Sequence, residues 1–255
     1  MRYFRLLIEY DGTSYQGWQT QKSGMTIQDV VSKTISGITD EQAILTSASR
    51  TDAGVHALGQ VAVFGTDSRL QAETLQRALN AKLPKDIRIR EIEERDSEFH
   101  PRYHAIKKSY FYFMEVTQKQ SVFLHRYAWR VPVSLDLACM NEAAASLLGT
   151  HDFSAFRGSG CGAKTTVRTI HSITISRYDY IDFMAARMEG DFIKIRIEAN
   201  AFLRHMVRNI VGTLAEVGKG RISAEAVKHV LTSCNRRMAG PTAPAKGLFL
   251  EKVFY

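Results

Sequence analysis

The sequence predicts an α+β protein built from two domains derived from the ferredoxin-like arrangement, with mostly antiparallel sheets flanked by helices. Three observations support this fold class. The chain has 255 residues, of which 45% are hydrophobic and 24% charged, a composition typical of a globular protein. Short alternating apolar runs recur along the chain, and segments with helical periodicity lie between them. In the first third their order is β-α-β-β-α-β, the split arrangement of ferredoxin-like domains.

Local signals justify each element of the N-terminal part. Thr26 with Asp29 three residues later reads as a capping box that opens a helix, and Pro84 ends a second helix. The expected elements are a strand at 3–9, a helix at 27–38, strands at 43–46 and 60–64, a helix at 72–82 and a strand at 87–92. We place the first domain at residues 1–105.

The rest of the chain repeats this theme with longer strands. Ser134 is expected to cap a helix that runs to Leu148, while Asn200 and Ser223 open two further helices. The expected strands lie at 108–114, 166–177, 191–198 and 248–255. We place the second domain at residues 106–255. Because no flexible linker marks the boundary, we expect the two sheets to be continuous or tightly packed around a central cleft.

Charge is distributed unevenly along the chain. The formal net charge is +8, yet residues 1–100 carry −2 and residues 101–255 carry +10. A one-sided basic excess indicates an anionic partner, with nucleic acid first and a membrane surface second. The alternative is a surface that is basic only for solubility.

Features of secreted and membrane proteins are missing from the sequence. The three cysteines are too far apart for a zinc-binding spacing and odd in number, which favours a reducing compartment. Arg5 and Glu9 interrupt the first apolar run, and no apolar run of 18 residues follows. We therefore expect a soluble cytoplasmic protein with no membrane partner.

Two motifs resemble known binding sites, but we reject a binding function for both. Residues 158–165 nearly spell a P-loop, but Ala163 occupies the position of the second glycine, and the motif leads into a predicted strand where a P-loop requires a helix. His100 and His104 have the spacing of metal ligands on a helix, but Pro101 lies between them. We expect no metal site.

The loop at 47–59 is long for a connection between two short strands, and it carries reactive side chains. Arg50, Asp52 and His56 flank the flexible Gly54. One interpretation is that Asp52 belongs to an active site. The alternative is that Asp52 caps the turn at Ala53-Gly54 and pairs with Arg50.

Two further segments place cations or aromatic rings where a ligand would use them. Arg204 and Arg208 are expected in the first turns of the helix after Asn200, where the helix dipole disfavours cations, so an anion such as a phosphate or Asp52 is expected to face them. Solvated arginines are the alternative. In the strand after Lys107, alternation gives Lys108 and two tyrosines one face, which could stack a base, and two phenylalanines the core-facing side. Ordinary packing of aromatic side chains in a sheet is the alternative there.

Taken together, these segments resemble the tRNA pseudouridine synthases that modify positions 38–40 of the anticodon arm. The run Arg50-Thr-Asp-Ala-Gly-Val-His56 is the most specific of the matching segments. Lys108 stands where many relatives have arginine. The matching segments, in order, are 10–21, 49–57, 99–102 leading to Tyr110, 200–209 and 243–248.

The resemblance implies a cofactor-free isomerase that converts uridine to pseudouridine. According to this resemblance, Asp52 is the catalytic nucleophile, attacking C6 or C1′, and Tyr110 packs on the target uracil. Arg50 and Arg208 are the basic residues around the aspartate. Phosphate contacts are expected from Lys107, Lys108, Lys164 and Arg204. The resemblance also implies tRNA as substrate and a homodimer. The alternatives are a non-catalytic RNA-binding module on the same scaffold and an enzyme that modifies another RNA uridine.

Overall fold

The computed structural model describes all 255 residues and divides them into two compact units. The first unit comprises Met1–Lys108 and Phe249–Tyr255, and the second Ser109–Leu248. The chain passes from one unit to the other within strand β5 (Lys107–Val116) and returns within strand β10 (Leu248–Phe254).

This division differs from the expected second domain at 106–255, because residues 249–255 belong to the first unit. Strand β10 pairs in parallel with strand β3, with Phe249 opposite His56 and Leu250 opposite Ala57. Pairing between strands that are so distant in the chain has no local sequence signal, whereas the first crossing lies close to the expected boundary.

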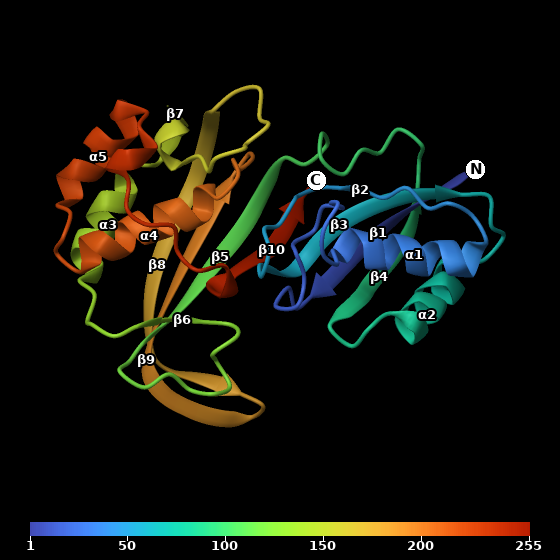
Figure 1. The fold of residues 1–255 in the computed structure, drawn as a ribbon, viewed down its shortest axis with the longest axis horizontal. Helices are drawn as coiled ribbons and strands as arrows, with labels where there is room; N and C mark the ends of the chain where they lie inside the picture. Colours follow the sequence, from blue (N-terminus) through green and yellow to red (C-terminus); the bar gives the residue numbers. More distant parts are fainter. The chain divides into compact units, whose positions relative to one another are not determined.

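The first unit is a sheet covered on one face by two helices (Figure 1). Its strand order is β4-β1-β3-β10, with β2 paired to β3, and β1 runs antiparallel to both of its neighbours. The expected order β-α-β-β-α-β is confirmed, although the strand expected at 43–46 is a two-residue strand. The elements are β1 (Arg2–Tyr10), α1 (Ile27–Thr39), β2 (Thr46–Ser47), β3 (His56–Thr66), α2 (Ala72–Lys82) and β4 (Ile87–Arg95).

The capping box at the start of α1 is confirmed. The Asp29 backbone N–H donates to the Thr26 hydroxyl oxygen over 3.2 Å, and that hydroxyl donates to an Asp29 carboxylate oxygen over 2.6 Å. The helix then buries Ile27, Val31 and Ile35 against the sheet. These buried side chains are spaced at helical intervals, so the pattern in the sequence sets both the start and the inner face of the helix.

The second unit combines a longer sheet with three helices packed together against it (Figure 1). Its strand order is β5-β9-β8-β7, with β6 parallel to β5, and β8 and β9 form a long antiparallel hairpin. The elements that follow β5 are β6 (Trp129–Val131), α3 (Leu137–Ala145), β7 (Gly149–Asp152), β8 (Val167–Phe183), β9 (Ala186–Ala199), α4 (Met206–Gly218) and α5 (Ala224–Ser233).

Two helix starts differ from the prediction. Asp136, and not Ser134, caps α3, because its side chain accepts from the Cys139 N–H. Helix α4 begins at Met206, since the Asn200 side chain is used elsewhere, accepting from the backbone N–H groups of Thr169 and Ala201. The expected helix start at Ser223 is confirmed. Arg204, which was expected in the first turns of this helix, therefore precedes α4.

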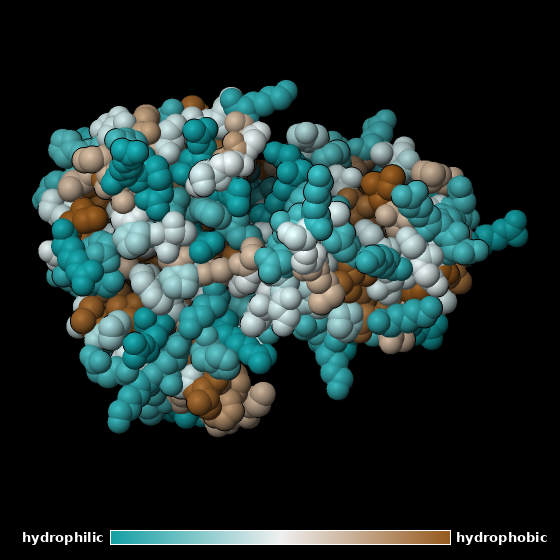
Figure 2. Space-filling model, viewed as in Figure 1, coloured by the Kyte–Doolittle hydropathy of each residue, from teal (hydrophilic) through white to brown (hydrophobic).

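The surface in this view is mostly hydrophilic (Figure 2). Large apolar side chains are nevertheless exposed at Val122, Phe123 and Met184, around the β8–β9 turn and the loop before β6. None of the helices combines the length and the apolar character needed to cross a lipid bilayer.

Candidate active site

Asp52 lies on a short, firmly held loop of the first unit. Because β3 already begins at His56, the loop spans residues 48–55 and is shorter than the 47–59 expected. Its backbone is bonded to the segment after β1: the Trp18 N–H donates to the Thr51 carbonyl over 3.0 Å, and the Gly54 N–H donates to the Tyr15 carbonyl over 3.3 Å. The Val55 N–H closes a turn onto the Asp52 carbonyl over 3.1 Å, which leaves the half-buried Asp52 side chain on a fixed backbone.

Glycines allow the segment after β1 to approach this loop backbone to backbone. Gly17 has φ +87°, and a Cβ atom built on it would lie 2.6 Å from the Thr51 carbonyl oxygen. A Cβ atom on Gly12 would lie 2.0 Å from the Val55 carbonyl oxygen. No larger residue fits at either position without movement of the loop, which explains the glycines of the matching segment 10–21.

Buried side chains fix the middle of the loop and the strand residue that follows it. The Tyr10 hydroxyl is bonded to the Thr51 hydroxyl over 2.7 Å. The buried His56 ring stacks on Phe249 at 4.6 Å between centroids. Its Nδ1 lies 3.1 Å from the Gly12 N and 3.0 Å from Asp11 Oδ1. A single ring nitrogen cannot accept from the N–H and donate to the carboxylate together, so the protonation state selects one contact.

The basic residues of the first unit occupy different environments. Arg50 is exposed on the Asp52 loop. The Lys107 ammonium lies 4.5 Å from the centroid of the Phe254 ring. Lys108 is only 6% exposed, and its ammonium donates to the Ala48 carbonyl at the start of the loop. This position differs from the exposed surface at which a phosphate-binding lysine is expected, so the structure favours a loop-holding role for Lys108.

Tyr110 belongs to the second unit, in strand β5. The sequence predicted that the two phenylalanines of this strand would face the core, and this is confirmed for Phe113, which packs against the buried cluster of Leu124, Ala128 and Phe192. Tyr110 and Tyr112 are buried, while Phe111 and Phe113 are half-exposed. The Tyr110 ring packs edge-on against Phe202, with 5.1 Å between centroids. Alternation gave the correct pairs of residues on each face, but apolar side chains pack on both faces of the strand, so the pattern alone does not decide which face is more deeply buried.

Arg208 lies in the first turn of α4 and is held by the segment 240–244. Its Nε donates to the Ala243 carbonyl over 2.7 Å, and the Ala243 N–H donates to the Arg208 carbonyl over 3.1 Å. A Cβ atom on Gly212 would lie 1.7 Å from the Pro241 carbonyl oxygen, so this segment lies directly on the helix. Burial raises the pKa of the Tyr112 hydroxyl strongly, and the positive charge of Arg208 acts on it in the opposite direction.

The glycine-rich stretch 158–165 forms a surface loop that leads into β8, and the predicted strand after this P-loop-like motif is confirmed. Arg204 is exposed and bonded to the start of the loop: its carbonyl accepts from the Gly158 N–H over 2.8 Å, and its Nη1 donates to the Ser159 carbonyl over 3.1 Å. Lys164 is exposed near the other end. Both cations are accessible to an anion.

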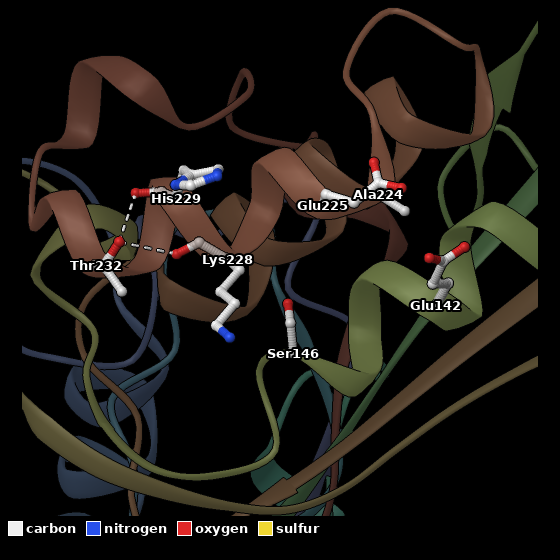
Figure 3. Close-up of a pocket in the computed structure, with 7 residues that line it drawn as sticks. All are labelled: Glu142, Ser146, Ala224, Glu225, Lys228, His229 and Thr232. Atoms are coloured by element: carbon white, nitrogen blue, oxygen red, sulfur yellow. Dashed lines mark hydrogen bonds between the residues drawn. The ribbon is translucent and has the colours of Figure 1, made fainter.

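The second unit also has a hollow of about 530 Å³ between α3 and α5 (Figure 3). None of the residues expected to act on a substrate lines it. The Thr232 hydroxyl, which faces the hollow, bonds within its own helix to the carbonyls of Lys228 and His229. The lining residues are Glu142, Ser146, Ala224, Glu225, Lys228, His229 and Thr232.

No three His, Cys, Asp or Glu side chains are grouped so that they could hold a metal ion. His100 and His104 lie in a turn, where the His100 N–H points to Nδ1 of His104 over 3.4 Å.

Comparison with known proteins assigns the class to which this fold and loop belong. The sequence model of the family described as tRNA pseudouridine synthase matches residues 6–104 and 143–255. Asp52, Arg50 and Arg208 lie within the matched ranges, and Tyr110 lies between them. Pseudouridine synthases are isomerases.

Individual relatives agree over the full length. A tRNA pseudouridine synthase A of Acetivibrio thermocellus is 48% identical over all of both chains. One of Thermodesulfovibrio yellowstonii is 43% identical over 98% of each chain. The chain therefore belongs to the tRNA pseudouridine synthase family. Among solved structures, a chain of an H/ACA ribonucleoprotein bound to a substrate RNA containing 2′-deoxyuridine gives a TM-score of 0.37 at 10% identity, over 84% of this chain and 43% of that one.

Proposed function

We propose that this chain converts uridine to pseudouridine at positions 38–40 of the tRNA anticodon arm, with Asp52 as the nucleophile and without a cofactor or metal. The observation that carries the proposal is the Asp52 loop. Its backbone is bonded on both sides to the segment after β1, while the Asp52 side chain stays half-exposed. A carboxylate held in one orientation and within reach of solvent suits attack on a bound base.

The reaction balances within the nucleoside. The C1′–N1 bond breaks, a C1′–C5 bond forms, the proton on C5 leaves and N1 gains a proton, so no atom or electron is added overall. Asp52 attacks either C6 of the ring or C1′ of the ribose, and its bond to the nucleoside breaks again when the product forms. Such a cycle uses only a carboxylate and proton transfers, which is the reason for proposing no cofactor.

The other expected residues receive roles that match their environments. The Tyr110 ring, supported edge-on by Phe202, is proposed to pack on the uracil after the base has left its stack, which costs a few kcal/mol. Arg50 and Arg208 are proposed as basic residues that bind the substrate. The exposed Lys164 and Arg204, together with Lys107, are proposed to contact phosphates.

Three further expectations belong to the same proposal. The β-α-β-β-α-β order of the first unit, with β1 paired to β4 and β3 and with β2 paired to β3, supports a ferredoxin-like origin for it. We propose the same origin for the second unit. We also propose a cytoplasmic homodimer, and light scattering of the purified chain would measure its mass in solution.

The decisive experiment incubates the purified chain with unmodified tRNA transcripts in EDTA, with no added cofactor, and maps pseudouridine by carbodiimide treatment and primer extension. Pseudouridine is expected at 38, 39 or 40. Transcripts with cytidine at those three positions serve as the control. Tight binding without any pseudouridine would instead identify a non-catalytic RNA-binding module, and pseudouridine elsewhere would identify an enzyme for another uridine.

A further inference from the structure

Gln60 is a fully buried polar residue in strand β3, and the proposed chemistry gives it no role. Its side chain is 0% exposed. Nε2 donates to the Ser49 carbonyl over 2.7 Å, and Oε1 accepts from the Ser49 N–H over 3.3 Å and from the Val61 N–H over 3.2 Å. Both polar atoms of the amide are therefore used, and two of the three bonds go to the Asp52 loop.

The bonds between Gln60 and Ser49 begin where the backbone pairing of β2 with β3 ends. Strand β2 pairs with β3 in antiparallel register, with Ser47 opposite Ala62, and the Ala48 N–H then donates to the Val61 carbonyl over 2.8 Å. The same register would place Ser49 opposite Gln60. There the side chain of Gln60 bonds to both the N–H and the carbonyl of Ser49, as the backbone of a neighbouring strand would. It thereby extends the pairing into the loop.

The geometry points to Gln60 as a positioning residue for Asp52, an inference that rests on the proposed function. Ser49 is three residues before Asp52, and the next fixed point along the loop is Thr51, whose hydroxyl and carbonyl are bonded to Tyr10 and Trp18. Gln60 holds the side of the loop that enters from β2. Without it, the half-buried Ser49 would lose both bonds to the amide, its carbonyl would still accept from the Ser47 hydroxyl over 3.2 Å, and the backbone that carries Asp52 would shift.

Glutamine suits this position for a chemical reason. The Ser49 carbonyl needs a donor and the Ser49 N–H needs an acceptor, and a neutral amide supplies both in one plane. Glutamate at this position would keep the acceptor for the Ser49 N–H but place a negative charge against the Ser49 carbonyl. Methionine would keep the shape of the side chain while removing both the donor and the acceptor.

The test compares Gln60→Met with a matched control in the same unit. Asn80 also uses both atoms of its amide on one backbone residue, since Nδ2 donates to the Ile89 carbonyl and Oδ1 accepts from the Ile89 N–H, each over 2.9 Å. Asn80→Leu therefore removes an equivalent pair of bonds away from the Asp52 loop. Both variants are assayed by single-turnover pseudouridine formation at saturating enzyme, beside a tRNA-binding titration and a melting curve.

We expect Gln60→Met to lower the single-turnover rate roughly 10- to 100-fold, as displacement of a reacting group by about 1 Å does, with tRNA affinity within about threefold of the wild-type value. Asn80→Leu should leave both unchanged. Rates are divided by the fraction of protein that binds tRNA, so partial unfolding does not imitate the effect. Gln60→Glu, which keeps one of the two bonds to Ser49, should also be slow.

Asp52→Asn is measured in the same series to separate two failures. If Asp52→Asn keeps turnover, the proposed nucleophile is wrong. If Asp52→Asn is inactive but Gln60→Met reacts as fast as Asn80→Leu, the positioning role of Gln60 is wrong while the proposed function stands.

Discussion

Two loops of this protein look alike in sequence and differ in structure. The Asp52 loop and the glycine-rich loop at 158–165 are both short, polar and glycine-containing, and both lead into a long strand. In the first, Ala48, Thr51 and Val55 are buried, and the backbone is bonded to the segment after β1. In the second, most residues are exposed, and the bonds to Arg204 are made by Gly158 and Ser159 at its start.

The difference shows what makes a loop suitable for covalent chemistry. A nucleophile gains rate only when its orientation is fixed before the substrate arrives, and burial of the surrounding backbone fixes it. An exposed loop with accessible cations can contribute charge to a polyanion without a fixed geometry, because phosphate contacts depend little on orientation. The two loops are therefore expected to respond differently to substitution.

The largest effect is expected from Asp52→Asn. The change keeps the size of the side chain but removes its charge and nearly all of its nucleophilicity, so single-turnover pseudouridine formation should fall by at least about 10³-fold. Affinity for tRNA should persist or rise slightly, because an anion is removed from a polyanion site. Turnover within about tenfold of wild type, roughly 1.4 kcal/mol of barrier, would remove Asp52 as nucleophile. Joint loss of folding and binding would favour the turn-capping alternative.

The next largest effect is expected when alanine replaces a glycine that contacts the Asp52 loop, compared with a glycine of the glycine-rich loop. Gly17 and Gly160 both have positive φ, +87° and +69°. The Cβ atom of alanine at Gly17 would meet the Thr51 carbonyl oxygen at 2.6 Å, whereas at Gly160 it would meet the tip of the Arg204 side chain at 2.8 Å. Backbone yields less than a flexible side chain, so Gly17→Ala should destabilise by roughly 2–4 kcal/mol and Gly160→Ala by about 1 kcal/mol.

Melting temperature and single-turnover rate measure this pair. Gly17→Ala should also slow turnover of the protein that remains folded, because Thr51 adjoins Asp52, and Gly160→Ala should not. Equal losses for the two variants would mean that the Asp52 loop is no more rigidly held than the glycine-rich loop.

A smaller effect is expected for charge in the exposed loop. Lys164→Ala should weaken tRNA binding and flatten the log–log salt dependence by roughly 0.7–0.9, the contribution of one neutralised phosphate. Lys33, an exposed lysine on α1 in the acidic part of the chain, provides the control, and its alanine variant should leave the slope unchanged. Identical slopes for wild type and Lys164→Ala would exclude a phosphate contact at this residue.

The smallest effect is expected from Gly162→Ala. A Cβ atom at this position meets no atom within 4 Å, and the residue does not have positive φ. The free energy of unfolding and the activation free energy of turnover should therefore each change by less than about 0.5 kcal/mol. A larger loss would show that the glycine-rich loop needs close backbone approach, as a nucleotide-binding loop does, and would weaken the contrast between the two loops.

Local signals predicted the parts of the fold that depend on neighbours in the sequence. Helix α2 has the predicted bounds, because its apolar spacing and the following Pro84 act within a few residues. The start of α4 was predicted at Asn200 and lies at Met206, since the Asn200 side chain bonds to β8. The return of β10 to the first unit had no local signal at all.

For the candidate site, the sequence alone indicated which residues we propose to carry the chemistry: the run around Asp52 is specific enough to indicate its family, and the charge and reactivity of these side chains are properties of the residues themselves. Only the tertiary structure decided which residues fix the positions of these side chains. Gln60, Gly17 and Tyr10 act on the Asp52 loop through contacts between segments distant in the chain, and the burial of Lys108 changes what its charge can reach. The physical reason is that chemical identity is local, whereas burial and hydrogen-bond partners exist only after the chain has folded.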